Sequence, residues 1–347
     1  MKAVLYDQFC GPIRIGEVET PPLPHDGALI AVRATGICRS DWHGWQGHDD
    51  DIRTLPHIPG HEFAGEIVSV GADVQKWKPG DRVTIPFVAG CGSCPECECG
   101  NPQVCDHQYQ PGFTGWGSFA EYVAVRYADM NLVRLPSELD YVTAASLGCR
   151  LATAYRAILL QGKLRSGEWL AVHGCGGVGL SAIMLAKAIG AQVLAIDVRA
   201  DALDLAQSLG AVATIRADQV EDVPAAVHAI TKRGAEVSLD ALGSRKTCSD
   251  SILSLRKRGR HVQVGLLAGA DYLPPLPMHR VIAWELELYG SHGLAAKDYS
   301  GLLELICTGR LDAARLVGRT ISLAEAPEVL MTMNNSAPLG VTVVDRF

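Results

Sequence analysis

The sequence predicts an α/β chain with two kinds of domain, an irregular antiparallel β domain and a doubly wound parallel sheet. Residues 1–149 hold short β-branched runs interrupted by Gly, Pro and Asp, which is typical of antiparallel strands. From residue 150 to residue 287, apolar strands alternate with helical segments, which is typical of βαβ units and a parallel sheet. Residues 288–347 return to a helix followed by strands.

These runs place the expected elements in chain order. In the first stretch, strands are expected at 1–6, 28–37, 64–71 and 81–88. In the middle stretch, six strands are expected at 169–174, 192–197, 211–215, 236–242, 261–266 and 285–290. In the last stretch, we expect a helix at 298–309 and a closing strand at 341–345.

The composition is that of an ordinary globular protein and limits its partners. The chain has 347 residues, enough for two domains, of which 48% are hydrophobic and 20% charged. A net charge of −7 argues against nucleic acid or an anionic membrane, because both bind basic patches. No apolar run is long enough to span a bilayer. The N-terminus lacks a signal-peptide pattern, so we expect a cytoplasmic protein whose 11 cysteines are metal ligands and buried thiols rather than disulfides.

Residues 90–105 contain four cysteines at close, regular spacing. The run GCGSCPECECGNPQVC places Cys91, Cys94, Cys97 and Cys105 in the pattern C-x2-C-x2-C-x7-C. Four thiolates this close can bind one Zn²⁺ tetrahedrally at Zn–S distances of about 2.3 Å, which leaves no open position. A disulfide cluster is the alternative, but this spacing favours a metal. We therefore predict a structural zinc lobe at 90–105, in which Cys99 has no role.

A second metal set is scattered over the surrounding sequence. Cys38 lies in GICRSDWH, His61 and Glu62 in PGHE, and Cys149 in SLGCR. A catalytic zinc typically keeps three protein ligands, and two cysteines with one histidine are a known combination. A lone cysteine is more often a small buried hydrophobe, so the prediction depends on these residues occurring together with the four-cysteine run.

A Gly-rich turn between a predicted strand and a predicted helix indicates a dinucleotide site. Gly174, Gly176 and Gly179 satisfy G-x-G-x-x-G, which permits a tight turn and close approach of a pyrophosphate to the helix N-terminus. Asp197 ends the next strand, where a carboxylate accepts hydrogen bonds from the adenosine ribose and favours NAD over NADP. Arg199 is the complication, because a nearby arginine can accommodate a 2′-phosphate.

These motifs occur in the order found in a known family. With G-x-C-x-S-D-x-H, GHE, the cysteine run and the Gly-rich turn, the chain resembles the zinc-dependent alcohol dehydrogenases of the medium-chain dehydrogenase/reductase superfamily, short microbial branch. The resemblance covers nearly the whole chain. It implies a GroES-like catalytic domain at 1–149 and 288–347, a Rossmann NAD-binding domain at 150–287, one catalytic and one structural zinc per chain, and a homotetramer, with a dimer as the alternative.

The resemblance also implies a proton path. The hydroxyl at the position of Ser40 takes the alcohol proton, which passes through the nicotinamide ribose to the histidine matching His43. Asp41 matches a carboxylate that orients the metal-bound histidine. Glu62 matches a residue that approaches the metal and sometimes replaces water there. The alternatives are Ser40 as a helix N-cap, His43 as a surface residue, and both carboxylates as solvated charges.

Further residues match family positions that contact the cofactor. Arg39 matches a residue that contacts the pyrophosphate. The cofactor walls and nicotinamide side are matched by Gly177, Val178, Leu242, Val264, Leu266 and Thr153, although the aliphatic members would serve equally as core. The chain departs from the family near its last strand. Some members carry a pyrophosphate-binding arginine where Gly340, Val341 and Thr342 stand, and Arg346 lies too far along to replace it.

The substrate class is open to more than one interpretation. Six residues suggest an apolar pocket and hence a hydrophobic primary or secondary alcohol, and they are Trp42, Trp45, Phe87, Val88, Trp116 and Leu266. Tryptophans on loops are also ordinary packing anchors. A polyol or amino-alcohol dehydrogenase is an alternative, but those relatives tend to carry Glu at the position of Cys149. A non-enzymatic zinc-knuckle binding protein is the alternative from another class, and the acidic charge and the pair Ser40 and His43 argue against it.

Overall fold

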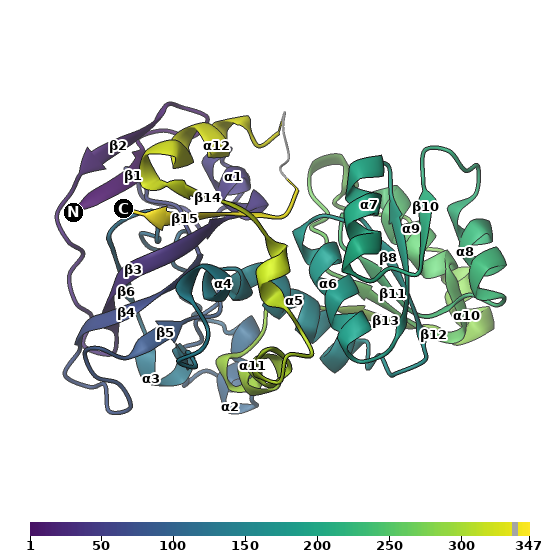
Figure 1. The fold of residues 1–347 in the computed structure, drawn as a ribbon, viewed down its shortest axis with the longest axis horizontal. Helices are drawn as coiled ribbons and strands as arrows, with labels where there is room; N and C mark the ends of the chain where they lie inside the picture. The colour runs from purple at the N-terminus through teal and green to yellow at the C-terminus, as the bar shows by residue number, and fades with distance from the viewer. Residues whose placement is uncertain (335–338) are drawn as a thin grey trace. The chain divides into compact units, whose positions relative to one another are not determined.

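The computed structural model describes residues 1–334 and 339–347, and the chain divides into two compact units (Figure 1). Unit 1 contains Met1–Ala152 and Gly293–Phe347, and unit 2 contains Thr153–His292. The domain limits expected from the sequence, 149/150 and 287/288, lie a few residues before these borders.

Unit 1 is built on a seven-stranded sheet with a two-stranded sheet beside its N-terminus. The strand order of the large sheet is β14-β15-β3-β4-β5-β7, and β6 also pairs with β3. The strands of unit 1 are β1 (Lys2–Tyr6), β2 (Ile13–Glu17), β3 (Ala28–Ile37), β4 (Glu62–Val70), β5 (Arg82–Thr84), β6 (Tyr122–Val125), β7 (Val133–Arg134), β14 (Val317–Ser322) and β15 (Val341–Arg346). The expected antiparallel pairing is observed for most pairs, but β14 and β15 run parallel.

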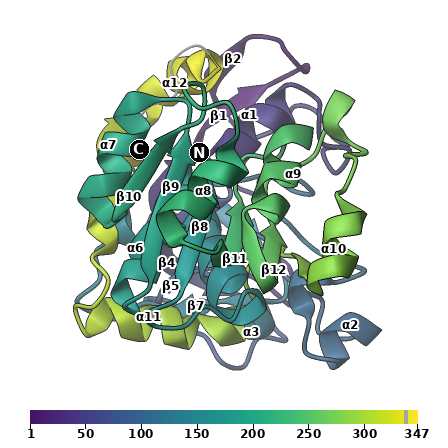
Figure 2. The same ribbon diagram turned by 90° about the vertical axis from the view of Figure 1, so that its right-hand side faces the viewer.

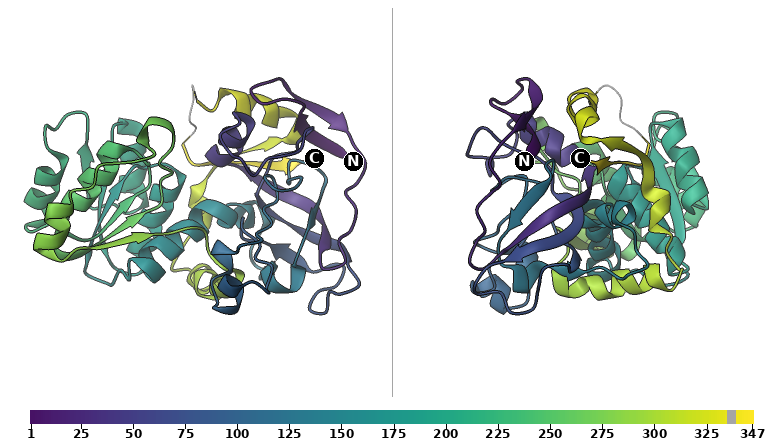
Figure 3. Two further views of the ribbon diagram at one scale, coloured as in Figure 1. Left: turned by 180° about the vertical axis from the view of Figure 1, so that it is seen from behind. Right: turned by 60° about the vertical axis from the view of Figure 1, so that its left-hand side comes forward.

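The last strand, β15, pairs with β3 in the large sheet of unit 1. Thr342 of β15 pairs with Ile37 at the end of β3, and Gly36 of β3 pairs with Glu62 at the start of β4. Figure 3 shows the yellow C-terminal strands lying against the purple N-terminal part of unit 1. The ends of β3 and the start of β4 therefore lie side by side, which fixes where the segments after Ile37 and before Glu62 meet.

Short helices connect these strands. In unit 1 they are α1 (Arg39–Trp45), α2 (Pro95–Glu98), α3 (Ala128–Asn131), α4 (Tyr141–Ala145), the π-helix η2 (Leu147–Leu151), α11 (Tyr299–Cys307), α12 (Ala326–Thr332) and the 3-10 turns η1 (Pro102–Val104), η5 (Ala296–Asp298), η6 (Ala313–Leu316) and η7 (Leu323–Glu325). The helix α5 (Ala152–Tyr155) follows η2 directly. The core of unit 1 forms two clusters, one of which contains Ile30 and Phe63 and the other Phe119.

Unit 2 is a six-stranded parallel sheet (Figure 2). Its strands are β8 (Trp169–His173), β9 (Gln192–Asp197), β10 (Ala213–Arg216), β11 (Ala235–Asp240), β12 (Leu255–Gln263) and β13 (Glu287–Gly290), in the order β10-β9-β8-β11-β12-β13. The helical elements are the π-helix η3 (Arg156–Gln161), α6 (Gly177–Ala188), α7 (Ala200–Leu209), α8 (Val223–Thr231), α9 (Arg245–Leu253), η4 (Gly269–Asp271) and α10 (Met278–Trp284).

This strand order is that of a dinucleotide-binding Rossmann sheet, in which ligands bind where the order reverses. Helices α6 and α7 pack together, as do α8 and α9. Right-handed crossovers place the two pairs on opposite faces. The order reverses between β8 and β11, which are neighbours in the sheet. The predicted fold class is confirmed, and all six expected strands are present. In the described residues, no helix is long and apolar enough to cross a membrane.

Candidate active site and metal centres

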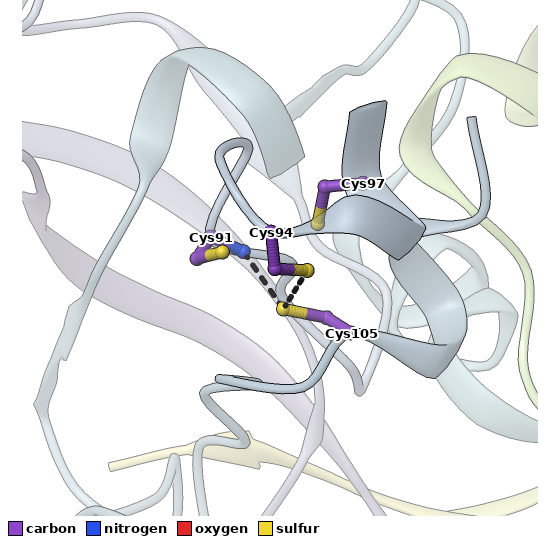
Figure 4. Close-up of side chains that lie close together, drawn as sticks. All are labelled: Cys91, Cys94, Cys97 and Cys105. Carbon is purple, nitrogen blue, oxygen red and sulfur yellow. Dashed lines mark hydrogen bonds between the residues drawn. The ribbon is translucent and has the colours of Figure 1, made fainter. Parts of the chain in front are cut away.

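The four-cysteine run forms a compact cluster in unit 1 (Figure 4). Cys94 is the N-cap of α2, Cys97 lies inside that helix, and Cys91 and Cys105 flank it. The four sulfur atoms lie within 4.8 Å of one another, and the Sγ atoms of Cys94 and Cys105 are 3.6 Å apart. Tetrahedral zinc with Zn–S bonds of about 2.3 Å separates its sulfurs by about 3.8 Å. The donor set therefore fits one zinc.

Several features support a metal rather than disulfides at this cluster. All four cysteines are free, and 3.6 Å is far longer than a sulfur–sulfur bond of about 2.05 Å. The thiolates also accept backbone N–H groups, since Cys91 donates to Sγ of Cys105 at 3.2 Å and Ser93 donates to Sγ of Cys91 at 3.4 Å. Cys99 is exposed and outside the cluster.

The second predicted set also comes together in unit 1. Cys38, His61, Glu62 and Cys149 place one ligand atom each within 4.8 Å of the others. Cys38 follows β3, His61 precedes β4, and Cys149 lies on the π-helical turn η2. Cys38, His61 and Glu62 are buried, whereas Cys149 is partly exposed. Three segments that are far apart in the sequence thus bring their ligand atoms together in unit 1.

His61 provides the test of whether a metal fits this set. Its Nδ1 atom contacts Oδ1 of Asp41 at 2.8 Å, while its Nε2 atom is buried without a hydrogen-bond partner. An unsatisfied buried nitrogen is costly, and a metal ion would satisfy it. Hydrogen bonding to Cys149 holds the pKa of Cys38 well below its usual value against the effect of burial, and the charge of Arg150 acts in the same direction. The thiolate is the form that binds a metal.

Asp41 connects the first two ligand segments. Its carboxylate accepts the N–H of Cys38 at 2.8 Å and the N–H of Gly60 at 3.1 Å, in addition to the contact with His61. The side chain of Asp41 is fully buried. A buried carboxylate on the outer nitrogen of a metal-binding histidine fixes the tautomer and orientation of the ring. The alternative of Asp41 as a solvated surface charge is wrong.

Glu62 is bound by an arginine that the sequence analysis did not single out. Arg150 donates from Nε to Oε1 of Glu62 at 2.9 Å and from Nη2 to Oε2 at 2.7 Å. Glu62 is fully buried, so it is not a solvated charge. Burial raises the pKa of Glu62, and Arg150 opposes that rise.

Helix α1 places two polar side chains next to this centre. Its N-cap is Cys38, so the alternative of Ser40 as a helix N-cap is wrong. Ser40 Oγ lies 3.9 Å from Sγ of Cys38. His43 is one turn further along the same helix face, half-buried, with Nδ1 at 3.1 Å from Nδ1 of His48. Burial is the largest cause that lowers the pKa of His43, and the charges of Arg39 and His48 lower it further.

Aromatic side chains surround the ring of His61. The ring centroids of Phe113 and Phe87 lie 5.1 and 6.3 Å from it. Of the residues predicted to line an apolar pocket, Phe87 is thus next to the metal set. Trp45 is not, because its indole donates to the Gly11 carbonyl at 2.9 Å and its ring belongs to the hydrophobic core. Val88 is also buried, at 2% exposure, and Trp116 packs against the same core as Trp45.

In unit 2 the Gly-rich turn has the predicted shape. Gly174 has a φ of +96°, and a Cβ on Gly179 would lie 1.9 Å from the Gly174 carbonyl oxygen. At Gly176, the N-cap of α6, an added Cβ would meet no atom within 4 Å. The turn therefore requires glycine for the close strand–helix contact and leaves open space at the helix N-terminus, where Gly177 and Val178 begin α6. This space fits a pyrophosphate.

Asp197 and Arg199 lie beside this turn with partners of their own. Asp197 accepts the N–H of Cys175 at 2.7 Å and the N–H of Arg199 at 2.9 Å. The guanidinium of Arg199 is paired with Asp201 at 2.5 Å. The arginine that complicated the choice between NAD and NADP is therefore matched by a carboxylate two residues further on.

The remaining cofactor candidates have mixed surroundings. Leu242 and Leu266 are 61% and 69% exposed, so the alternative that they are core residues is wrong. Val178 and Val264 are half-buried. Thr153 is buried, and its hydroxyl has no hydrogen-bond partner.

The C-terminal segment of unit 1 holds the side chain of Arg39. Its guanidinium donates to the Met333 carbonyl at 3.2 Å and to Oδ1 of Asn334 at 2.9 Å, and it stacks over the Trp42 ring at 4.2 Å. Arg346 pairs with Asp345 at 2.9 Å and with Glu325 at 3.7 Å.

Three residues near the metal set were missed in the sequence. Arg150 had a usable signal, because an arginine inside the apolar segment SLGCRLATA is buried only if it is paired. Phe113 and His48 carried none, since neither belongs to a spacing pattern and both approach the site through loops.

A Rossmann sheet, a set of two cysteines and one histidine, and a set of four cysteines in one chain define a class, the zinc-containing dinucleotide-dependent dehydrogenases. Comparison with known proteins agrees. The family model of the alcohol dehydrogenase GroES-like domain matches residues 24–137, and that of zinc-binding dehydrogenases matches residues 177–308. An alcohol dehydrogenase of Geobacillus stearothermophilus is 34% identical over 96% of this chain and 95% of its own length. An NAD-dependent alcohol dehydrogenase of Saccharolobus solfataricus is 32% identical over 99% of both chains.

Solved structures give the same result. The alcohol dehydrogenase TADH from Thermus sp. ATN1 matches with a TM-score of 0.90 and 34% identity over 100% of both chains. A zinc-binding dehydrogenase from Sinorhizobium meliloti, bound to NADP, matches with a TM-score of 0.88 and 29% identity over 99% of this chain and 98% of its own. The chain belongs to the zinc-dependent alcohol dehydrogenases of the medium-chain dehydrogenase/reductase superfamily.

Proposed function

We propose that this chain catalyses the reversible oxidation of a hydrophobic primary or secondary alcohol by NAD, giving an aldehyde or ketone and NADH. The observation that carries the proposal is the set Cys38, His61 and Cys149, in which the buried Nε2 atom of His61 has no hydrogen-bond partner. Three ligands leave one position for the substrate oxygen, unlike the closed four-cysteine set. Zinc per chain, followed by NADH formation over a panel of alcohols, tests the proposal, and a chain that forms no NADH with any alcohol would contradict it.

The residues around this set have separate tasks in the reaction. Cys38, His61 and Cys149 would hold the catalytic zinc, which supplies Lewis-acid polarisation of the substrate hydroxyl when bound. Asp41 orients His61 through its Nδ1 atom. Phe87 and Phe113 lie next to the ring of His61 and would keep water away from it.

The proton leaves through helix α1. Ser40 would accept the proton of the substrate hydroxyl while it gives up its own, and the imidazole of His43 would take up a proton from this path and release it toward solvent. The position of Ser40 next to ligand Cys38 and the contact of His43 with the exposed His48 support these roles. Because burial lowers the pKa of His43, its ring is neutral and able to accept a proton over a wider pH range than an ordinary histidine.

The Gly-rich turn of unit 2 would hold the pyrophosphate of NAD, and NAD when bound supplies the hydride acceptor. Gly174, Gly176, Gly177 and Gly179 admit the pyrophosphate to the N-terminus of α6. Asp197 binds the adenosine ribose, while the charge of Arg199 is paired with Asp201. We assign the cofactor walls to Val178, Leu242, Val264 and Leu266, the nicotinamide side to Thr153, and a pyrophosphate contact to Arg39.

Replacing Asp197 tests the cofactor choice. Asp197→Ala removes the ribose acceptor and the repulsive charge, so kcat/KM with NAD should fall by about 10- to 100-fold, the value of a hydrogen bond to a charged group. The ratio of NADP to NAD activity should rise. Asp218→Ala is the control, because Asp218 is an aspartate near the end of the neighbouring strand β10 and pairs with Arg216 instead of facing the Gly-rich turn. An unchanged cofactor preference would mean that Asp197 faces elsewhere.

The substrate preference can be tested against the polyol alternative. Phe87 and Phe113 offer apolar surface and no hydrogen-bonding group for additional hydroxyls. We expect kcat/KM to rise with the apolar size of the alcohol and to be low for polyols. We also propose a cytoplasmic homotetramer, with a dimer as the alternative, from the family resemblance. Light scattering of the purified chain decides the oligomeric state.

A further inference from the structure

A single buried guanidinium lies next to the catalytic metal set. Arg150 keeps 8% of its surface exposed and sits on the π-helical turn η2, immediately after ligand Cys149. It donates two parallel hydrogen bonds to Glu62, at 2.9 and 2.7 Å, and a third to the carbonyl of Ile37 at 2.6 Å. π-Helical turns in otherwise α-helical segments occur frequently at functional sites.

Each contact of Arg150 reaches a different ligand segment. Ile37 directly precedes Cys38, Glu62 directly follows His61, and Arg150 itself follows Cys149. One side chain thus connects the three parts of the chain that supply the metal ligands. Asp41, in contrast, connects only the segments of Cys38 and His61.

The carboxylate of Glu62 has little freedom apart from this contact. A Cβ on Gly36 would lie 2.6 Å from Oε2 of Glu62, and a Cβ on Gly148 would lie 3.2 Å from its Cα. Two glycines, one on each side, therefore let Glu62 pack tightly between β3 and η2. Glu62 also offers an oxygen within 4.8 Å of the other ligand atoms.

We propose that Arg150 is a positioning residue of the metal centre, which holds the three ligand segments together through Glu62 and the carbonyl of Ile37. The inference rests on the proposed function, because it takes Cys38, His61 and Cys149 as the ligands of the catalytic zinc. The bidentate contact of Arg150 with Glu62 is specific to arginine, since lysine keeps the charge but cannot form two parallel hydrogen bonds.

A purely structural role would predict something else. If Arg150 only balances the charge of Glu62 in the core, Arg150→Lys would lower the stability and leave the metal unaffected. If Arg150 positions the ligands, Arg150→Lys should weaken zinc binding at one of the two sites in a protein that is still folded. Loss of an outer partner of a metal ligand typically weakens metal binding by about 10- to 100-fold.

The test measures zinc binding of the folded full-length protein. The parent, Arg150→Lys and Arg260→Lys are dialysed against a chelator of known zinc affinity, and zinc per chain is determined well below the unfolding temperature. Arg260 is the matched control in unit 2, because it also makes two bonds to one glutamate, Glu168, at 2.9 and 2.8 Å, and one to a carbonyl, that of Lys163, at 2.9 Å. Thiol alkylation followed by peptide mapping identifies which cysteines have lost their metal.

We expect Arg150→Lys to bind the zinc of Cys38 and Cys149 about 10- to 100-fold more weakly, with the Cys91 cluster unchanged, and Arg260→Lys to match the parent at both sites. A zinc affinity of Arg150→Lys within about twofold of the parent, well short of the loss expected for an outer partner, would overturn the inference and leave the proposed function standing. A parent that binds both metals but oxidises no alcohol would overturn the function alone.

Glu62→Gln provides a second variant in case Arg150→Lys does not fold. The glutamine amide cannot accept both hydrogen bonds, so this variant breaks the contact from the other side. If Arg150 acts through Glu62, the double variant Arg150→Lys, Glu62→Gln binds zinc no more weakly than the poorer single variant. Additive losses would show that the two residues act independently and would overturn the inference.

Discussion

The two cysteine-containing clusters of unit 1 use the same local device for different ends. Cys38 is the N-cap of α1 and Cys94 is the N-cap of α2. Three residues after the first cap stands Asp41, which orients a histidine, and three residues after the second stands Cys97, which is itself in the cluster. In both clusters a ligand cysteine starts a helix. The other ligands of the four-cysteine cluster come from the same short run, whereas the other ligands of the Cys38 cluster come from distant segments.

The surroundings of the two clusters differ in the same sense. Sulfur atoms of the four-cysteine cluster accept backbone N–H groups, from Cys91, Ser93 and His107. The other cluster is surrounded by the side chains of Asp41 and Arg150. Backbone donors and four thiolates make a closed site that stabilises the fold. Side-chain partners and three ligands leave one position and several groups that can serve the reaction.

The largest expected effect separates these two roles. Cys91→Ser should destabilise the fold, because a cost of about 4 kcal/mol or more is characteristic of losing a structural metal. Cys38→Ser should lower kcat by about 10³-fold or more with a smaller loss of stability, because several kcal/mol of transition-state stabilisation disappear with the metal. Urea unfolding, zinc per chain and kcat of both variants are the measurements. A folded, active, zinc-depleted Cys91→Ser protein would contradict the structural role.

The same contrast explains what the sequence could predict. The four-cysteine cluster lies within the short run 91–105, so its spacing alone identified all four members. The Gly-rich turn is equally local. The three-ligand set could be predicted only because it occurs together with the four-cysteine run, since residues 38, 61 and 149 approach one another only through the pairing of β3 with β4 and the position of η2. Arg150, Phe113 and His48 depend on side-chain directions in the folded chain, which no spacing pattern encodes.

The second largest loss of activity is expected at the residue two positions after the N-cap cysteine of α1, compared with the same position of α2. Ser40→Ala should lower kcat toward the upper end of about 10²–10⁴-fold, since a positioned proton acceptor next to the substrate oxygen is lost. Glu96→Ala is the control, because Glu96 stands at the same position of α2, after Cys94. Zinc content should stay at the parental value in both. Equal activity of Ser40→Ala and Glu96→Ala would show that Ser40 on α1 has no more part in the reaction than Glu96 on α2.

A smaller effect is expected five positions after each cap. His43→Ala should slow alcohol oxidation by about 10²-fold near neutral pH, the lower end for a general base. Burial lowers the pKa of His43, so the parental ring is neutral and active down to mildly acidic pH. Without it, water or hydroxide must accept the proton, and the deficit should shrink as the pH rises.

Cys99→Ala is the control for His43→Ala, because Cys99 follows Cys94 by the same interval and is exposed. Its pH–rate profile should overlay that of the parent. The measurement is kcat against pH for the three proteins, with zinc and NAD binding determined for each. If the profile of His43→Ala also overlays the parent, the proton path is wrong and His43 is a surface residue.

The smallest effect tests whether the path continues beyond α1. Burial lowers the pKa of His43 most, the charges of Arg39 and His48 lower it further, and Cys38 raises it. His48→Gln keeps a polar partner for His43 but removes one of the two charges that lower this pKa. The pKa of His43 should therefore rise, and the rate should begin to fall at a higher pH as the solution is acidified. At neutral pH we expect a loss of no more than about fivefold, the value of one hydrogen bond. An acid limb that does not move, or that moves to lower pH, would show that His48 is not coupled to His43. In that case proton transfer to solvent starts at His43 itself.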